Sequence, residues 1–136
     1  MEFRNRVQTI RKAVVNMKKM QSYHILFYTL EHCYWICREE DLVIIIGSMD
    51  PEMMADGYPI DPAPLSTWWD DIVAGADVGI ENYSEYIYRF LEYYEDRFGF
   101  QVPEAKKLVK NETNARLYRE ALEYSERLYA KYGYKD

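Results

Sequence analysis

The carboxylates are the side chains of this sequence whose number and spacing could do chemistry. The segment 47–71 alone holds six acids, four prolines and two adjacent tryptophans. If it were a calcium loop with Gly57 at the sixth position, Met54 would stand at the third and Ala63 at the twelfth. A thioether and a methyl group cannot replace the oxygen ligands required there, so an EF-hand is excluded.

Adjacent acids elsewhere could act as a general acid and base, or hold a metal for a carboxylate-based enzyme. Glu39, Glu40 and Asp41 form one such group, and Asp70 and Asp71 form another. Neighbouring carboxylates are, however, common on solvated faces. The sequence contains neither a nucleophile elbow nor a glycine-rich phosphate loop. We therefore predict a non-enzymatic protein without a cofactor, and keep a metal-dependent enzyme as an alternative.

Two cysteines one helical turn apart, Cys33 and Cys37, could offer two soft metal ligands. A zinc site needs four ligands, and on a helix His32 would point about 100° away from Cys33. Since both cysteines lie in an apolar stretch, we expect buried thiols and no metal site. His24 is expected at the edge of the core or on the surface, without a catalytic role.

Charge is distributed unevenly along the chain. Residues 1–38 carry a net charge of +5, residues 39–88 carry −12 without a single base, and residues 89–136 carry +1. Either the basic start of the chain, with Arg4, Arg11 and Lys18, folds against the acidic block, or the block attracts a basic protein. We expect no nucleic-acid partner, because phosphates would be repelled.

The start of the chain has the apolar spacing of a helix. Apolar residues recur at steps of three and four from Val7 through Met20 to Cys37. This spacing predicts one long helix, or two helices with a break near Gln21 and Ser22. No apolar run is long enough to span a bilayer, and no secretory signal follows the basic start. We expect a cytoplasmic protein with no membrane contact.

Two helices are predicted in the middle of the chain. Asp61 can cap the first, which would end at Gly75. Asn82 and Glu85 stand at capping-box spacing before the second, which would end at Gly99. The buried positions expected in the first helix are Leu65, Trp68, Trp69, Ile72 and Val73. Those expected in the second are Tyr83, Tyr86, Ile87, Phe90, Leu91, Tyr94 and Phe98.

The remaining segments are also read as helical. A helix can begin at Pro103, and another runs from about 111 to 132, ending at Gly133. Its expected buried positions are Ala115, Tyr118, Leu122, Ser125, Leu128 and Tyr129. The β-branched run 42–46 could be a strand, but no other run could pair with it, so we predict a short helix. The fold class is an all-α, single-domain helical bundle over residues 1–136, with a long proline-containing acidic loop.

Part of the chain resembles a group of small bacterial proteins without assigned activity. The likeness rests on the runs YHILFYTLEHCYWICREEDL, IGSMDPEMMADGYPIDPAP and YRFLEYYEDRFGF and on a Trp-Trp-Asp-Asp sequence. The positions that match are Glu39, Glu40, Asp41, Gly47, Ser48, Met49, Asp56, Gly57, Pro59, Asp61, Pro62 and Trp69. The chain departs from the pattern at Val43, Ile44 and Ile45, where glycine and leucine are expected, and its tail after residue 101 lies outside it. Such proteins are similar to the immunity proteins that accompany bacterial polymorphic toxins, and the resemblance implies neutralisation of a toxin.

The segment 47–71 then has two readings. In one, Met53, Met54, Tyr58 and the tryptophans cap an end of the bundle. In the other, the acids surround an aromatic anchor on a surface that binds a basic protein. The residues predicted to contact that partner are Glu39, Glu40, Asp41, Asp50, Glu52, Asp56, Tyr58, Asp61, Trp68, Asp70 and Asp71. A homo-oligomer paired through tyrosine-rich helices remains an alternative.

Overall fold

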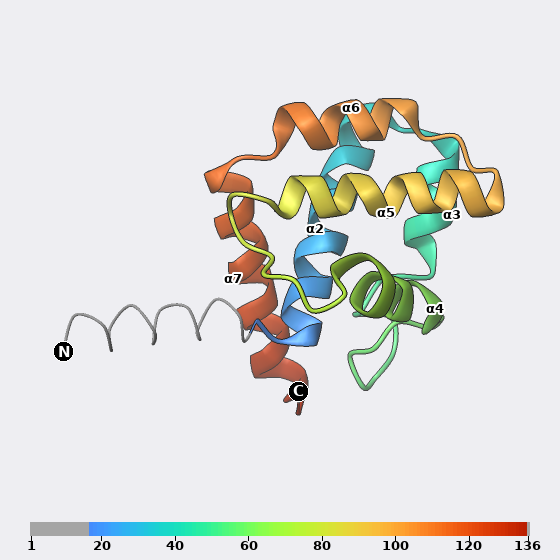
Figure 1. The fold of residues 1–136 in the computed structure, drawn as a ribbon. Coiled ribbons are helices and arrows are strands. Elements are labelled where there is room, and N and C mark those ends of the chain that lie inside the picture. The colour runs from blue at the N-terminus through green and yellow to red at the C-terminus, as the bar shows by residue number, and fades with distance from the viewer. Residues whose placement is uncertain (1–16, 136) are drawn as a thin grey trace.

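A computed structural model describes residues 17–135 of the chain (Figure 1). These residues form six α-helices and one π-helix, and they contain no β-strand, which confirms the all-α prediction. The elements follow in the order α2 (Lys19–Cys37), α3 (Glu40–Gly47), α4 (Ala63–Ser66), η1 (Thr67–Val73), α5 (Tyr83–Phe98), α6 (Pro103–Glu112) and α7 (Ala115–Tyr132). Every one of them contributes to one cluster of buried apolar side chains.

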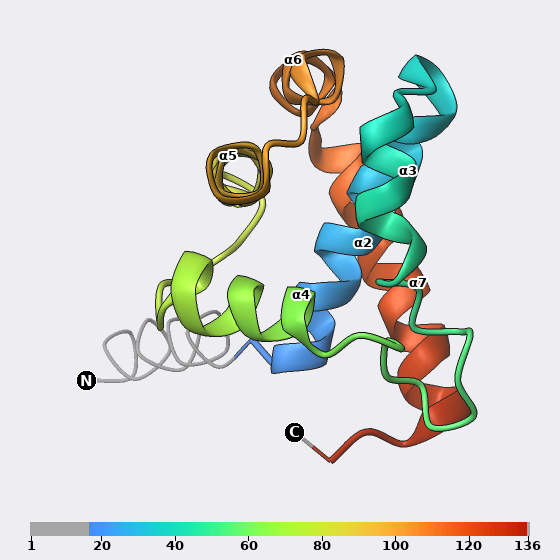
Figure 2. The same cartoon turned by 90° about the vertical axis from the view of Figure 1, so that its right-hand side faces the viewer.

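Helix α2 is the central element of the fold. Helix α7 packs along it, and α3 and α6 also contact it (Figures 1 and 2). Enclosure by these neighbours explains why His24 is fully buried, against the prediction of an edge or surface position. Its Nδ1 forms a hydrogen bond of 2.8 Å with Ser125 Oγ on α7. This histidine therefore joins two helices in the core.

The two ends of α2 are set by local backbone geometry. Gln21 and Ser22, where a break was predicted, lie inside α2, and the part of the predicted helix before residue 17 lies outside the described residues. Lys18 has an extended conformation (ψ 149°), so α2 begins at Lys19. Continuous helix through this point, the other alternative, is excluded for the same reason. At the far end Arg38 is left-handed (φ 55°), and its N–H donates to the carbonyl of Tyr34. Its guanidinium lies 4.3 Å from the ring centroid of Trp35.

The β-branched run predicted as a short helix is α3. Leu42, Ile45 and Ile46 share its buried face, at the spacing of one helical face, whereas Val43 and Ile44 are exposed. The run has no strand to pair with among the described residues. A helix satisfies its backbone internally, so the prediction of a helix is confirmed.

Helix α4 continues directly into the π-helix η1. The Asp61 carboxylate accepts a hydrogen bond from Ala63 N (2.9 Å), close to the predicted capping role. The wider π-helical turns were not predicted. They bury Trp68 completely and leave its neighbour Trp69 half-buried. The helix ends at Ala74 (φ 47°), one residue before the predicted glycine.

Helix α5 has the predicted bounds and ends at Gly99 in the left-handed region. The predicted capping box is wrong. The Asn82 side chain accepts from Gly79 N (2.8 Å) and donates to the Asp77 carbonyl (2.7 Å), so it organises the preceding loop. Phe98 is exposed against expectation, because it occupies the last position before the chain turns away.

Helix α6 begins at Pro103 as predicted, whereas α7 begins later than expected. Asn114 caps α7 by accepting a hydrogen bond from Leu117 N (2.9 Å), so the helix starts at Ala115, which is exposed. Ser125 is buried as predicted. Leu117 and Ala121 on the same helix are also buried, although neither was predicted to be. The apolar face is thus rotated slightly from the predicted one.

Candidate functional site

Two of the predicted partner-binding acids hold the protein's own backbone. The Glu39 carboxylate accepts hydrogen bonds from Glu104 N (3.0 Å) and Ala105 N (2.8 Å) at the start of α6. The Asp41 carboxylate accepts one from Gln101 N (2.7 Å). Glu104 and Ala105 lie in the first turn of α6, where N–H groups have no partner within the helix, and Gln101 lies just before the helix. The two acids therefore stabilise the entry to α6. Neither Glu39 nor Asp41 therefore belongs to the candidate partner-binding surface.

Trp68, the predicted aromatic anchor, is also an internal residue. Its side chain is fully buried, and its Nε1–H donates to Ser22 Oγ on α2 (3.2 Å). Its ring meets Phe90 edge to face, with the centroids 6.1 Å apart. A partner could not reach this indole, so the prediction that Trp68 binds a partner is wrong.

The other predicted acids remain accessible but lie on three different elements. Glu40 is exposed at the first position of α3, at the opposite end of that helix from the loop that follows it. Asp70 and Asp71 are exposed on η1. The third group, in the loop 49–61 between α3 and α4, is the one that the fold combines with apolar side chains.

The loop 49–61 is fastened to the body of the protein at both of its sides. The Tyr23 hydroxyl on α2 donates to the Met49 carbonyl (2.6 Å), and the Tyr134 hydroxyl donates to the Gly57 carbonyl (2.6 Å). Figure 2 shows the loop beside the end of α7 from which Tyr134 extends. Pro51 and Pro59 are buried and restrict the backbone further.

Burial keeps the first of these tyrosines protonated. Loss of hydration, followed by the proximity of Tyr94, Asp50 and Asp61, raises the pKa of Tyr23 far above its usual value. The hydroxyl is therefore a donor at any physiological pH, and the Met49 carbonyl always has its partner.

Close packing at Gly57 explains why this position carries no side chain. Its φ is +80°, and a Cβ placed there would lie 2.5 Å from Cγ of Tyr132. The backbone conformation and the contact each favour glycine. The resulting turn presses the loop against the end of α7.

Three aspartates shape the loop from within. Asp50 accepts a hydrogen bond from Glu52 N (2.8 Å), Asp56 from Tyr58 N (3.0 Å) and Asp61 from Ala63 N. Each is a side-chain turn in which one carboxylate oxygen replaces a backbone carbonyl. None of the three carboxylates forms an ion pair with a described residue. The acids thus shape the loop and still charge its surface.

Large apolar side chains project from the same loop. Met53 is 62% exposed, Met54 46%, Ile60 57% and Tyr58 38%. The expectation that the methionines cover an end of the bundle is therefore wrong, whereas Tyr58 packs edge to face against Tyr134, with the ring centroids 5.4 Å apart. Instead, four apolar side chains stand among the acids, and Met53, Met54 and Ile60 were missed as surface residues. The signal available in the sequence was their position in a proline-rich segment between two helices, because such loops run over the surface.

One acid from another element joins the group. Burial, followed by the nearby charges of Asp50 and Glu52, raises the pKa of Glu31 on α2. The same two acids, with Glu31, act after burial to raise the pKa of Tyr124 on α7. A single negative region therefore includes Glu31 although nineteen residues separate it from Asp50 in the sequence.

Cys33 is buried and Cys37 half-buried, and neither forms a disulfide. Among residues 17–135, no three His, Cys, Asp or Glu side chains are grouped to hold a metal ion.

Lys18 lies over the Tyr129 ring, 5.2 Å from its centroid, and forms no ion pair with the acids of the 47–71 segment. Within the part described, none of the helices combines the length and apolar character needed to cross a membrane.

Comparison of the chain with protein-family models, with curated proteins and with solved structures gave no match.

Proposed function

We propose that this chain is a non-enzymatic binding protein that recognises a basic protein through the loop 49–61. The observation that carries the proposal is a fastened loop whose outer face combines four exposed apolar side chains with acids. Apolar contacts at the centre and charges around them are the usual composition of a protein interface. Methionine side chains add adaptable contacts.

The hydrogen bonds that hold the loop support this role energetically. A binding loop that is already ordered loses less conformational freedom on association, so more of the contact energy appears as affinity. Its negative charge would steer a basic partner toward it and raise the association rate. Nucleic acid does not fit this surface, because its phosphates would be repelled.

Toxin neutralisation in the cytoplasm is the specific form that we propose, because of the resemblance to immunity proteins. Neutralisation requires tight binding and no chemistry, which agrees with a site made of apolar groups and acids. The alternative of a carboxylate-based enzyme loses support, because Glu39 and Asp41 are engaged with the backbone of α6 and its preceding turn.

A second candidate, self-association, is favoured by a different set of residues. Trp35 and Ile36 at the end of α2 and Val43 and Ile44 on α3 are exposed large apolar side chains. Sedimentation of the purified protein over a wide concentration range would test it. A stable dimer that Ile44→Asp dissociates would support self-association through this region, and a monomer at all concentrations would exclude it.

The first test of the proposed function is whether the reading frame next to this chain's gene encodes a basic toxin domain, and the second measures how that purified domain binds this chain. We expect Glu52→Gln with Asp56→Asn to slow association about tenfold at low salt, and to weaken its dependence on salt. Asparagine keeps the oxygen that accepts from Tyr58 N, so the loop geometry is preserved. Stopped-flow mixing at several salt concentrations measures the rate.

The matched control is Glu92→Gln with Asp96→Asn, which removes two exposed acids from α5 instead. It should leave the association rate nearly unchanged. Equal effects of the two double variants would show that net charge, and not the loop, guides the partner. Unchanged binding and unchanged protection of cells by the loop variant would refute the proposal.

A further inference from the structure

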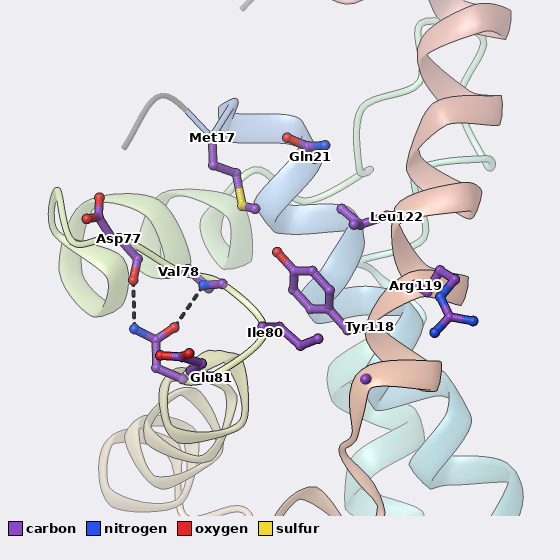
Figure 3. Close-up of a pocket in the computed structure, with 12 residues that line it drawn as sticks. Met17, Gln21, Asp77, Val78, Ile80, Glu81, Tyr118, Arg119 and Leu122 are labelled. Atoms are coloured by element: carbon purple, nitrogen blue, oxygen red, sulfur yellow. Dashed lines mark hydrogen bonds between the residues drawn. The ribbon is translucent and has the colours of Figure 1, made fainter. Parts of the chain in front are cut away.

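A cavity between three segments of the described residues lies away from the loop 49–61. It has a volume of about 830 Å³ and opens between the start of α2, the loop 77–82 and the first turns of α7. Figure 3 shows Met17, Ile80, Tyr118 and Leu122 around it. This volume lies within the range of about 300–1,000 Å³ that is typical of ligand sites.

The walls of this cavity are held in place by contacts of their own. Asn82 bridges Gly79 N and the Asp77 carbonyl, which fixes the loop on one side. The Tyr118 ring packs against Tyr83, with the centroids 5.0 Å apart. Ile80 nevertheless remains 50% exposed at the cavity. The protein gains stability when apolar groups cover the apolar part of this lining.

We propose that the sixteen residues preceding Met17 in this chain fill the cavity. The first argument is continuity, because Met17 itself lies on the cavity wall and the segment is attached there. The second is the sequence pattern of the segment, whose apolar residues Phe3, Val7, Ile10 and Val14 recur at steps of three and four. That spacing suits a stripe laid into a groove.

Charge supplies a third, independent argument. Asp77 and Glu81 lie on the loop side of the cavity, are exposed and form no ion pair with a described residue. The sixteen residues carry four bases and one acid, a net charge of +3. Arg119 stands on the opposite side from these two acids (Figure 3). The bases of the segment are therefore drawn to the side formed by the loop 77–82.

This occupancy divides the acidic block 39–88 between two roles. Asp77 and Glu81 are neutralised within the chain, whereas the acids of the loop 49–61 stay free for a partner. The inference does not depend on the proposed function, since the cavity and the loop share no residue.

Nuclear Overhauser effects between methyl groups in the full chain provide the test. We expect cross-peaks from Ile10 or Val14 to Ile80 or Leu122 in the unaltered protein. Absence of all of them would overturn the inference. Cross-peaks that appear only between differently labelled copies would show that a second copy fills the cavity, which would also overturn it.

A pair of variants checks that the apolar stripe is the cause. Ile10→Asp with Val14→Asp should abolish these cross-peaks and shift the methyl resonances of Val78 and Ile80. The control, Asn5→Asp with Thr9→Asp, adds the same charge off the stripe and should retain the cross-peaks. If the control abolishes them equally, charge alone holds the segment and the apolar docking is refuted. The cross-peaks of the unaltered chain remain decisive even if a variant fails to fold.

Discussion

The type of a residue does not by itself decide its environment in this protein. Glu39 binds two backbone N–H groups of α6, whereas Glu40 points to solvent. Trp68 is buried, whereas Met53 and Met54 are exposed. From residue types alone, Trp68 was predicted both on a buried helix face and among the partner contacts, and only the buried position is found. The methionines were expected to cover an end of the bundle in one of two interpretations, and they are exposed instead.

The two cysteines make a residue-scale prediction. Burial raises the pKa of Cys33 to about 12, and it also raises the pKa of the half-buried Cys37. A raised pKa lowers the thiolate fraction at neutral pH, and the thiolate is the reactive form. We expect an alkylating reagent to spare Cys33 in the native protein and to modify Cys37 slowly. Peptide mass mapping measures this.

Two results would contradict that prediction. Modification of Cys33 at the rate of a free thiol would show that the core opens readily there. Zinc copurifying at one equivalent per chain, and lost in a variant with both cysteines changed to alanine, would show that the thiols are ligands.

The same scale offers a clean comparison of two acids. Glu39→Ala removes both acceptors from the start of α6 and should cost about 1–2 kcal/mol of unfolding free energy. Glu40→Ala, one residue away and without a hydrogen bond in the structure, should change stability by less than about 0.5 kcal/mol. Urea denaturation of both variants provides the measurement. Equal losses would mean that the hydrogen bonds of Glu39 contribute nothing specific.

At the scale of elements, the loop 49–61 owes its shape to contacts from distant parts of the chain. Met49 is held by α2 through Tyr23, and Gly57 is held by Tyr134 beyond α7. The aspartate turns supply the local bends between these points. Such a loop is ordered by its anchors, although its outer residues are exposed.

Two glycines test the anchoring of this loop. Gly57→Ala should destabilise the protein by more than about 1 kcal/mol, because φ is positive and Tyr132 occupies the space. Gly47→Ala at the end of α3 meets no atom within 4 Å, and should stabilise by about 0.5–1 kcal/mol. Thermal unfolding compares the two. A Gly57→Ala variant as stable as the unaltered protein would refute the tight contact.

At the scale of the whole molecule, buried tyrosines predict sensitivity to alkali. Burial is the main cause that raises the pKa of Tyr83 to about 12 and of Tyr94 to about 12 from an ordinary value of 10.0. Each folded tyrosine holds its proton more tightly than the unfolded one. The associated stability is complete below pH 10 and is lost as the pH rises toward 12.

Urea midpoints recorded from pH 8 to 12 should therefore fall from about pH 10 upward. Tyrosinate absorbance should rise in step with unfolding, because buried hydroxyls ionise only when the core opens. Ionisation of all tyrosines near pH 10 in a protein that stays folded would contradict the buried positions.

The helices could be predicted from the sequence because their signals are local. Apolar spacing along α5, the proline at the start of α6 and the glycines after α5 and α7 act within a few residues of the elements that they define. The short helix α3 followed from the lack of a strand partner. The same local signals misplaced the start of α7, where Asn111 and Asn114 are both plausible caps.

The surface was decided by the tertiary structure. Which acids face outward depends on pairs such as Glu39 with Ala105, and the inward position of Trp68 depends on Ser22. The partners in these contacts are 66 and 46 residues apart, so no local pattern records them. Sequence alone determined an acidic, helical chain with a proline-rich loop. Packing between distant segments determined that this loop shows methionines and acids to solvent, because burial is a property of the neighbours that the fold assembles.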